Sequence, residues 1–129
     1  MSRYLLDTHV FLWMAADPDK LSRRVRKIVA QKNSALHMSA ASGWEIALLR
    51  RLGRINLPDA PERFVPEAMQ QLQVEPIAIG FSTAIAAAGL PLIHRDPFDR
   101  IIIAEAQKGK MTVLTRDAKF AEYGIPVIW

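Results

Sequence analysis

The sequence predicts a three-layer α/β fold, in which a short parallel sheet of about five strands is flanked by helices. Segments of strand character alternate with helical segments along the chain, as in parallel sheets joined by right-handed crossovers. The expected strands are short and apolar on both faces, which is typical of strands buried between two helical layers. The 129 residues, 50% hydrophobic and 23% charged, suit one globular domain over residues 1–129.

Five apolar segments are expected to form the strands. The third contains Pro76, which has no backbone N–H to give to a ladder, so we expect this strand at an edge of the sheet. The five segments cover residues 4–6, 35–38, 74–77, 111–114 and 126–128.

Helices are expected between these strands and after the fourth. Ser22 is a favourable N-cap for the second helix, and either Ser39 or Ser42 for the third, which Gly53 ends. Gly109 is expected to close the sixth helix. The expected helices cover residues 10–16, 22–31, 42–52, 61–72, 82–88, 97–108 and 118–123.

The composition excludes several classes of protein. The chain has no Cys, which excludes disulfides and thiolate metal sites. No apolar run approaches the roughly 20 residues of a membrane span, and no signal peptide is recognisable, so we expect a cytoplasmic protein without a membrane segment. The net charge of +4 suits a polyanionic substrate, but ordinary solubilising charge explains it equally well.

Two aspartates follow expected strands directly. Asp7 and Asp117 each lie between a strand and the helix that comes next. If those strands are parallel neighbours, both carboxylates emerge at the edge of the sheet where α/β proteins bind their ligands. Each of the two could instead simply cap the helix that follows it.

Glu45 lies inside the apolar stripe of its expected helix. The positions four before it and three, four and seven after it are Ala41, Leu48, Leu49 and Leu52, so its side chain should face the core. A buried Glu without a partner is costly, which indicates a functional carboxylate. A core salt bridge, or a side chain leaning outward at the edge of the stripe, is the structural alternative.

Asp96 and Asp99 stand at the start of the helix that begins at Pro97. Asp96 is expected to be the N-cap, with Pro97 at the first helical position. Asp99 suits the helix dipole, but it also shares a face with Ile102 and Ile103 and therefore points inward. We expect Asp99 to be a metal ligand and Asp96 to support the site by fixing the start of the helix.

Taken together, the inward and strand-end carboxylates predict a site for a hard divalent cation. Like charges gathered in one crevice repel one another unless a cation neutralises them. The three His residues are scattered without zinc-ligand spacing, so an all-oxygen site suited to Mg²⁺ is expected. Such a site can activate water against a phosphodiester. The predicted catalytic and metal-binding residues are Asp7, Glu45, Asp99 and Asp117.

The motifs resemble the PIN-domain ribonucleases and, among these, the VapC-type toxins of bacterial toxin–antitoxin pairs. The resemblance spans nearly the whole chain, and its specificity comes from the order and spacing of the motifs. They are Leu5-Leu6-Asp7-Thr8-His9 with Leu12-Trp13, Ser42-Gly43-Trp44-Glu45-Ile46-Ala47, His94-Arg95-Asp96-Pro97-Phe98-Asp99-Arg100, Leu114-Thr115-Arg116-Asp117 and Tyr123-Gly124-Ile125-Pro126-Val127-Ile128-Trp129.

The resemblance implies a PIN-like fold with a five-stranded parallel sheet, and an endoribonuclease that uses Mg²⁺ or Mn²⁺ to cleave single-stranded RNA. By position, the four predicted acidic ligands match the acidic residues of the family, and Thr8 and Thr115 match polar residues beside its site. A homodimer and a cognate antitoxin protein are implied as well. Gly43, and Glu105 where related chains often have Gln, depart from the family pattern.

Two basic clusters are candidates for contact with the phosphate backbone of RNA. One lies on the helix that Ser22 opens, and the other lies near the end of the helix that carries Glu45. A solvated helix face is the simpler explanation for both. The predicted RNA-binding residues are Arg23, Arg24, Arg50 and Arg51.

Two alternatives to a metal-dependent ribonuclease toxin remain open. A non-catalytic PIN-like module that binds RNA or a protein would have no need of four carboxylates in one crevice, which disfavours it. A phosphoaspartyl receiver built on Asp7 would need a Lys at the crevice and would leave Glu45 unexplained, so it is disfavoured more strongly.

Overall fold

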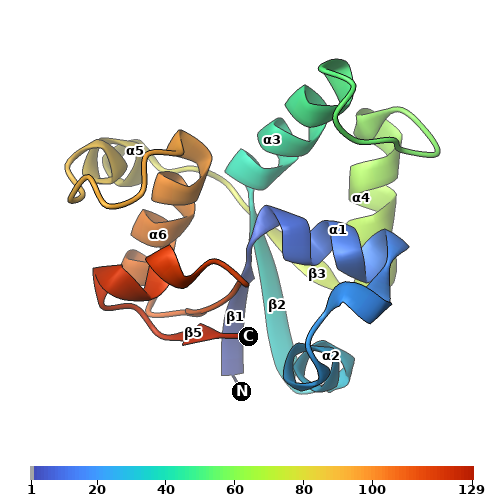
Figure 1. The fold of residues 1–129 in the computed structure, drawn as a ribbon, viewed down its shortest axis with the longest axis horizontal. Helices are drawn as coiled ribbons and strands as arrows, with labels where there is room; N and C mark the ends of the chain where they lie inside the picture. Colours follow the sequence, from blue (N-terminus) through green and yellow to red (C-terminus); the bar gives the residue numbers. More distant parts are fainter. Residues whose placement is uncertain (1) are drawn as a thin grey trace.

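A computed structural model describes residues 2–129, which form a five-stranded parallel sheet with helices on both faces (Figure 1). The strand order is β3-β2-β1-β4-β5, and every neighbouring pair is parallel. The predicted fold class is thereby confirmed, with all five strands at the predicted places. The strands are β1 (Ser2–Leu6), β2 (Ser34–Ser39), β3 (Val74–Ile77), β4 (Thr112–Leu114) and β5 (Val127–Ile128).

β3 lies at an edge of the sheet, as Pro76 predicted. Pro76 is in register with Met38 of β2, and within residues 2–129 no strand pairs with the other side of β3. An edge is where a residue without an N–H interrupts the fewest ladder bonds.

Helices fill the connections between the strands. Two short 3₁₀ helices occur as well; the one at Pro18–Lys20 was not predicted, and the expected helix over 118–123 is the other. The helices are α1 (Thr8–Ala16), η1 (Pro18–Lys20), α2 (Arg23–Ala30), α3 (Ala40–Arg51), α4 (Pro61–Leu72), α5 (Phe81–Ala88), α6 (Pro97–Gly109) and η2 (Ala118–Tyr123).

The helix ends follow from local chemistry. The hydroxyl of Ser22 accepts the amide of Val25 at 3.0 Å at the start of α2, as predicted. For α3 the N-cap is Ser39 rather than Ser42, since the Ser39 hydroxyl accepts the amide of Ala41. The predicted stop of α6 at Gly109 was wrong by one residue, because Lys110 takes the left-handed conformation with φ 51°.

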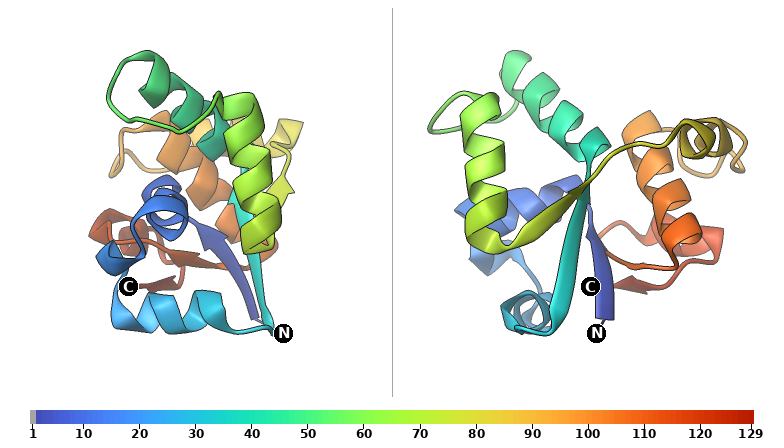
Figure 2. Two further views of the ribbon diagram at one scale, coloured as in Figure 1. Left: turned by 90° about the vertical axis from the view of Figure 1, so that its right-hand side faces the viewer. Right: turned by 180° about the vertical axis from the view of Figure 1, so that it is seen from behind.

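The sheet separates two apolar cores, and Figure 2 shows the two helical layers from behind. α1, α2 and α4 lie on one side of the sheet, while α5 and α6 lie on the other. Successive side chains of a strand point to opposite faces, so Leu6 and Leu114 pack on the first side and Leu5 and Val113 on the second. This is why the central strands are apolar throughout.

Among residues 2–129, no helix combines the length and the apolar character that crossing a membrane requires.

Candidate active site

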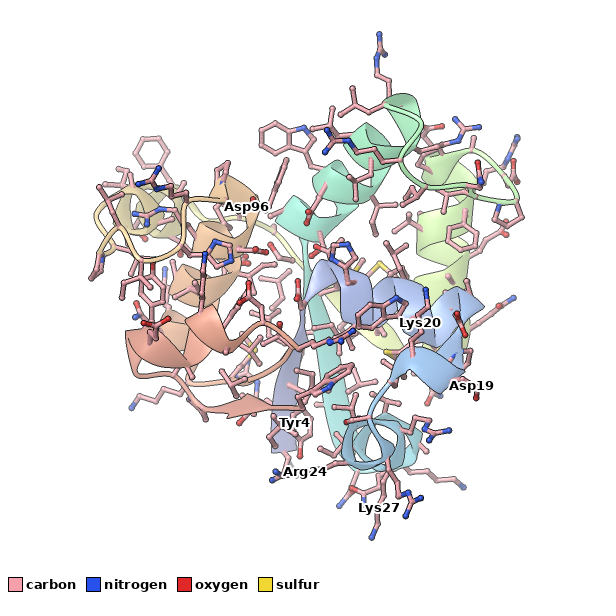
Figure 3. All side chains as sticks on the ribbon, viewed as in Figure 1. Tyr4, Asp19, Lys20, Arg24, Lys27 and Asp96 are labelled. Carbon is pink, nitrogen blue, oxygen red and sulfur yellow. The ribbon has the colours of Figure 1, made fainter. Side chains whose placement is uncertain are left out.

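The four predicted acidic ligands line one cleft of about 350 Å³ at the carboxyl ends of β1 and β4. They come from four separate segments: the end of β1, α3, the first turn of α6 and the loop after β4. Figure 3 shows Asp96 at the amino end of α6, from which it also reaches this cleft. The cleft is lined by Asp7, His9, Trp13, Glu45, Asp96, Asp99, Arg116 and Asp117.

Asp7 is buried beside the end of β4. β1 and β4 are neighbours with Leu6 opposite Leu114, so Asp7 and Thr115 lie next to each other. The Asp7 side chain makes no cap bond with α1; instead its Oδ2 accepts the Thr115 hydroxyl at 2.7 Å. Burial raises the pKa of Asp7, and the Thr115 bond lowers it to a lesser extent. A capping role therefore does not explain Asp7.

Asp117 both caps a helix and faces the cleft. Its Oδ1 accepts the amide of Lys119 at 2.9 Å at the start of η2. Its Oδ2 lies 2.8 Å from Nε2 of His94. The Thr115 hydroxyl also accepts the Asp117 amide at 3.0 Å, so Thr115 ties this residue to Asp7.

Glu45 is buried on α3 as predicted, but the stripe that predicted it does not face the core throughout, because Leu48 and Leu52 are exposed. Its Oε1 is buried and has no hydrogen-bond partner within residues 2–129. The Thr8 hydroxyl lies close by but donates to Ser42 Oγ at 2.9 Å. Burial raises the pKa of Glu45, Thr8 lowers it, and the charges of Asp96 and Asp7 raise it further. The described residues offer Glu45 no salt bridge, so the core ion-pair alternative was wrong.

The two acids at the start of α6 take the positions that were predicted for them. Asp96 is the N-cap, and its Oδ1 accepts the amide of Phe98 at 2.9 Å. Asp99 points inward and is largely buried. Burial, followed by repulsion from neighbouring carboxylates, of which Asp7 is the strongest contributor, raises the pKa of Asp99 to about 8. The cleft therefore holds more negative charge than its own residues neutralise.

His94 is a member of the site that the sequence did not reveal. This residue is buried in the loop before α6, and its Nε2 lies 2.8 Å from Asp117 Oδ2 and 2.9 Å from Asp99 Oδ2. The expectation of purely oxygen surroundings was incomplete for this reason. The position of His94 two residues before Asp96 is the sequence feature that could have indicated its place in the site. Spacing rules for zinc ligands do not identify a histidine in a loop that folds back on a helix.

Arg100 holds the loop that carries His94. Its buried guanidinium donates to four main-chain carbonyls at 2.7–3.2 Å, and no carboxylate pairs with it within residues 2–129. The planar, multiply donating fork of arginine suits such a cluster of acceptors. The four acceptors are the carbonyls of Ala88, Leu90, Pro91 and His94.

The predicted basic clusters lie outside the cleft lining. Arg23 and Arg24 begin α2 and are not among the residues that line the cleft. Arg50 and Arg51 lie in the last turn of α3. The basic side chain that lines the cleft itself is that of Arg116, which the sequence reasoning did not single out.

The donor set of the cleft fits a divalent cation. Carboxylate oxygens are the ligands that hard cations such as Mg²⁺ prefer, and several of them converge here. The buried, unpartnered Oε1 of Glu45 and the raised pKa of Asp99 both mark a place where positive charge would be stabilising. Within residues 2–129, the one group of three side chains with metal-binding spacing is His94, Asp99 and Asp117; Asp7 and Glu45 line the same cleft but belong to no such group.

The chain matches known proteins over nearly its whole length. The family model of the PIN domain matches residues 4–126. Ribonuclease VapC22 of Mycobacterium tuberculosis (strain ATCC 25618 / H37Rv) is 30% identical over 129 residues, which span 98% of this chain and 95% of that protein. Ribonuclease VapC16 of the same organism is 35% identical over 54 residues, which span 42% of this chain and 38% of that protein.

Solved structures share the same fold. VapBC2 from Rickettsia felis, bound to a DNA fragment of its promoter, superposes with a TM-score of 0.71 at 15% identity, over 98% of this chain and 97% of that chain. FitAcB from Neisseria gonorrhoeae superposes with a TM-score of 0.63 at 21% identity, over 98% and 96%. With the family match, the VapC22 relationship and the acidic cleft at the carboxyl ends of β1 and β4, the chain belongs to the PIN domain family and is a relative of the VapC ribonucleases.

Proposed function

We propose that this chain is a divalent-metal-dependent endoribonuclease that cleaves single-stranded regions of RNA as the toxin of a toxin–antitoxin pair. The observation that carries the proposal is the convergence of acidic side chains from four segments into one cleft. The relationship to a curated VapC ribonuclease supports the ribonuclease activity. The VapBC and FitAcB structures support the assignment to a toxin–antitoxin system.

Four carboxylates would hold the ion, which we propose to be Mg²⁺ or Mn²⁺. When bound, such an ion supplies positive charge that stabilises the phosphate in the transition state and makes a water molecule more acidic. The proposed catalytic and metal-binding residues are Asp7, Glu45, Asp99 and Asp117.

Three neighbouring residues would keep these carboxylates in place. Thr115 orients Asp7 through a 2.7 Å hydrogen bond. Thr8 lies beside Glu45 and is fixed by its bond to Ser42. Asp96 sets the first turn of α6, from which Asp99 projects. Each acts through a carboxylate rather than on the RNA.

Basic side chains that could bind the RNA lie both at the cleft and outside it. Arg116 is exposed and lines the cleft, where it can pair with a phosphate next to the cleaved bond. The helix clusters could extend the track of phosphate contacts away from the cleft. Their members are Arg23, Arg24, Arg50 and Arg51.

A homodimer and an antitoxin partner form part of the proposal. Large apolar side chains remain exposed on α3 and α5, which is unusual for a surface that faces only water. The similar structures include VapBC2 on promoter DNA and a toxin–antitoxin complex from Klebsiella pneumoniae, which supports a protein partner for this chain. The cytoplasm, where RNA is made and used, is the compartment that this function requires. The exposed residues are Trp44 and Leu48 of α3, Leu52 directly after it, and Phe81 and Ile85 of α5.

A cleavage assay tests this function. Purified protein is incubated with single-stranded RNA in Mg²⁺ or Mn²⁺, with and without EDTA. Cleavage should require the ion and should fall about 100-fold or more in Asp7→Asn and Asp99→Asn. Asp19→Asn removes an exposed charge far from the cleft and serves as the matched control. RNA binding without cleavage in any metal would instead support the non-catalytic module.

A further inference from the structure

The imidazole of His94 contacts two of the proposed ligands at once. Its Nε2 lies 2.8 Å from Asp117 Oδ2, with hydrogen-bond geometry, and 2.9 Å from Asp99 Oδ2. All three residues lie within the spacing that a metal ion could bridge. Proximity alone would therefore make His94 a candidate third metal ligand.

The other ring nitrogen decides against that assignment. Nδ1 of His94 accepts the backbone amide of Asp96 at 3.3 Å, so Nδ1 carries a lone pair and no proton. In the neutral imidazole the proton must then sit on Nε2, which makes Nε2 a donor toward the carboxylates. A histidine that binds a metal through Nε2 needs the opposite tautomer, with Nδ1–H donating to an acceptor. Here that Nδ1–H would point at the Asp96 N–H.

The surrounding structure fixes the ring in this orientation. The His94 amide donates to the Tyr123 hydroxyl at 2.7 Å, and its carbonyl accepts from Arg100 at 3.0 Å. The ring packs edge-on against Phe120 with centroids 5.7 Å apart. Three elements, η2, α6 and the loop before α6, thus hold the side chain, so its Nε2–H keeps its direction toward Asp117 while Asp99 Oδ2 lies close by.

We propose that His94 is a positioning residue that holds Asp117 beside Asp99 through the hydrogen bond from Nε2–H to Asp117, and that it does not itself ligate the ion. The contact engages Oδ2 of each carboxylate. Within residues 2–129 it leaves Oδ1 of Asp99 without a hydrogen bond and available to a cation. This inference rests on the proposed metal-dependent function, but its tests are independent of RNA cleavage.

The tautomer is measured directly by NMR. Long-range ¹H–¹⁵N correlation spectra of the ¹⁵N-labelled protein distinguish Nε2–H from Nδ1–H for each histidine. They are recorded without divalent ions and then with saturating Mg²⁺, which is diamagnetic. His94 should show the Nε2–H pattern in both spectra. A switch to Nδ1–H when Mg²⁺ is added would overturn the proposal, since it is the signature of a ligand.

Metal affinity in two variants separates positioning from ligation. The amide nitrogen of His94→Gln reaches the place of Nε2 and still donates, but it cannot bind a cation as imidazole nitrogen does. His94→Ala should weaken Mn²⁺ binding about tenfold in calorimetry, as loss of an outer partner of a metal site typically does. His94→Gln should retain affinity close to the unaltered protein. His37→Gln, which alters a histidine of β2 outside the cleft, is the control.

Each outcome of the calorimetry decides the question. Equal loss in His94→Gln and His94→Ala would indicate a metal ligand, and no loss in His94→Ala would indicate a residue without influence on the site; either overturns the proposal. Normal Mn²⁺ binding in a protein that cuts no RNA would count against the ribonuclease function alone and leave the assignment of His94 intact.

Discussion

Three of the site carboxylates are held in surroundings that disfavour their charge. Burial is the largest cause of the raised pKa of Asp7, Glu45 and Asp99. Folding therefore gathers carboxylates where burial opposes their charge, which lowers the stability of the metal-free protein. A fold that accepts this penalty at one place is expected to have a ligand there.

Neutralising Asp99 should stabilise the metal-free protein. At pH 7 the folded state keeps a proton on Asp99, whose pKa is about 8, while the unfolded chain releases it. Asp99→Asn removes this proton uptake and the repulsion behind it, so the free energy of unfolding in EDTA should rise by about 1–3 kcal/mol. Urea unfolding measures the change, and Mn²⁺ should stabilise the unaltered protein but not the variant. A less stable Asp99→Asn variant in EDTA would contradict this explanation.

The buried carboxyl group of Glu105, which lies outside the cleft, should make the stability of the protein depend on pH. Both its oxygens are buried without a hydrogen-bond partner within residues 2–129, and the nearby Ser39 hydroxyl lowers its pKa by less than burial raises it. Burial raises the pKa of Glu105 to about 7. Between pH 4.5 and 7 the folded state holds a proton that the unfolded chain has lost, so stability should fall as the pH rises through this window.

Glu105→Gln should remove that fall. The variant should be more stable than the unaltered protein by about 2 kcal/mol at pH 8 and nearly equal to it at pH 4. Urea unfolding at the two pH values measures the difference. Glu67→Gln, at an exposed position of α4, makes the same change of charge and should leave the pH profile unchanged. A Glu105→Gln variant that loses stability at pH 8 would contradict the burial of an unpartnered carboxylate.

The inward acids were predictable because regular elements have a period. Asp99 shares a helix face with Ile102 and Ile103, which are buried, so the phase of α6 predicted its inward position. The phase of α3 was a weaker guide to Glu45, because Leu48 and Leu52 of its stripe are exposed. Asp7 was predictable from its place directly after a buried strand. His94 lies in an irregular loop without any periodicity, so its approach to Asp117 depends on tertiary structure that a single sequence does not encode locally.

Arg100 joins the start of α6 to the loop that precedes it. The guanidinium lies in the first turns of the helix and satisfies carbonyls of the loop that connects α5 to α6. These bonds join the loop to the buried guanidinium at four points, and each hydrogen bond to a charged group contributes about 1.5–3 kcal/mol where it is shielded from water. Arg100 thus orders the segment that presents His94.

Arg100→Lys should loosen this loop although it keeps the charge. Lysine has one nitrogen and cannot reach carbonyls on several sides as the guanidinium does. We expect a loss of about 2–4 kcal/mol in unfolding free energy. Hydrogen exchange measured by mass spectrometry should show faster exchange over residues 88–95, while β1 and β4 stay protected. Unchanged exchange in this loop would mean that other contacts order it.

The boundaries of the elements were predictable where a capping residue stands at the boundary. Ser22 and Asp96 cap α2 and α6 as their residue types indicate. The C-terminal end of α6 was mispredicted, since the chain turns at Lys110 although Gly109, the better left-handed residue, stands next to it. The Lys110 amide returns to Ala106 O, so the closing hydrogen bond sets the end there.

At the scale of the whole molecule, the order of the strands places the carboxyl ends of β1 and β4 side by side and so forms the cleft. β1 lies between β2 and β4, and β4 comes more than 70 residues after β2. Alternation of strands and helices predicted a parallel sheet, but it does not specify which strands are neighbours. The pairing of β1 with β4 therefore had to come from the structure, and it is what joins Asp7 to Thr115.

The exposed apolar face of α5 predicts self-association. Phe81 and Ile85 lie one turn apart and are 88% and 62% exposed. Packing this face against a second copy of the chain would stabilise the dimer by about 25 cal/mol for each square ångström of apolar surface that is buried. Light scattering should give twice the 14.5 kDa of one chain, and Phe81→Glu should shift the protein to monomer. Gln70→Glu on α4 is the control. A monomeric unaltered protein at micromolar concentration would exclude the dimer.

The metal site itself is tested most directly by anomalous diffraction from crystals soaked in Mn²⁺. The account predicts an anomalous peak in the cleft at about 2.1–2.3 Å from carboxylate oxygens of Asp7 and Asp99, with His94 Nε2 outside the coordination sphere. In Asp99→Asn crystals soaked in the same way the peak should weaken or vanish. Full occupancy of the cleft by Mn²⁺ in Asp99→Asn, or no peak among these carboxylates in the unaltered protein, would contradict the account.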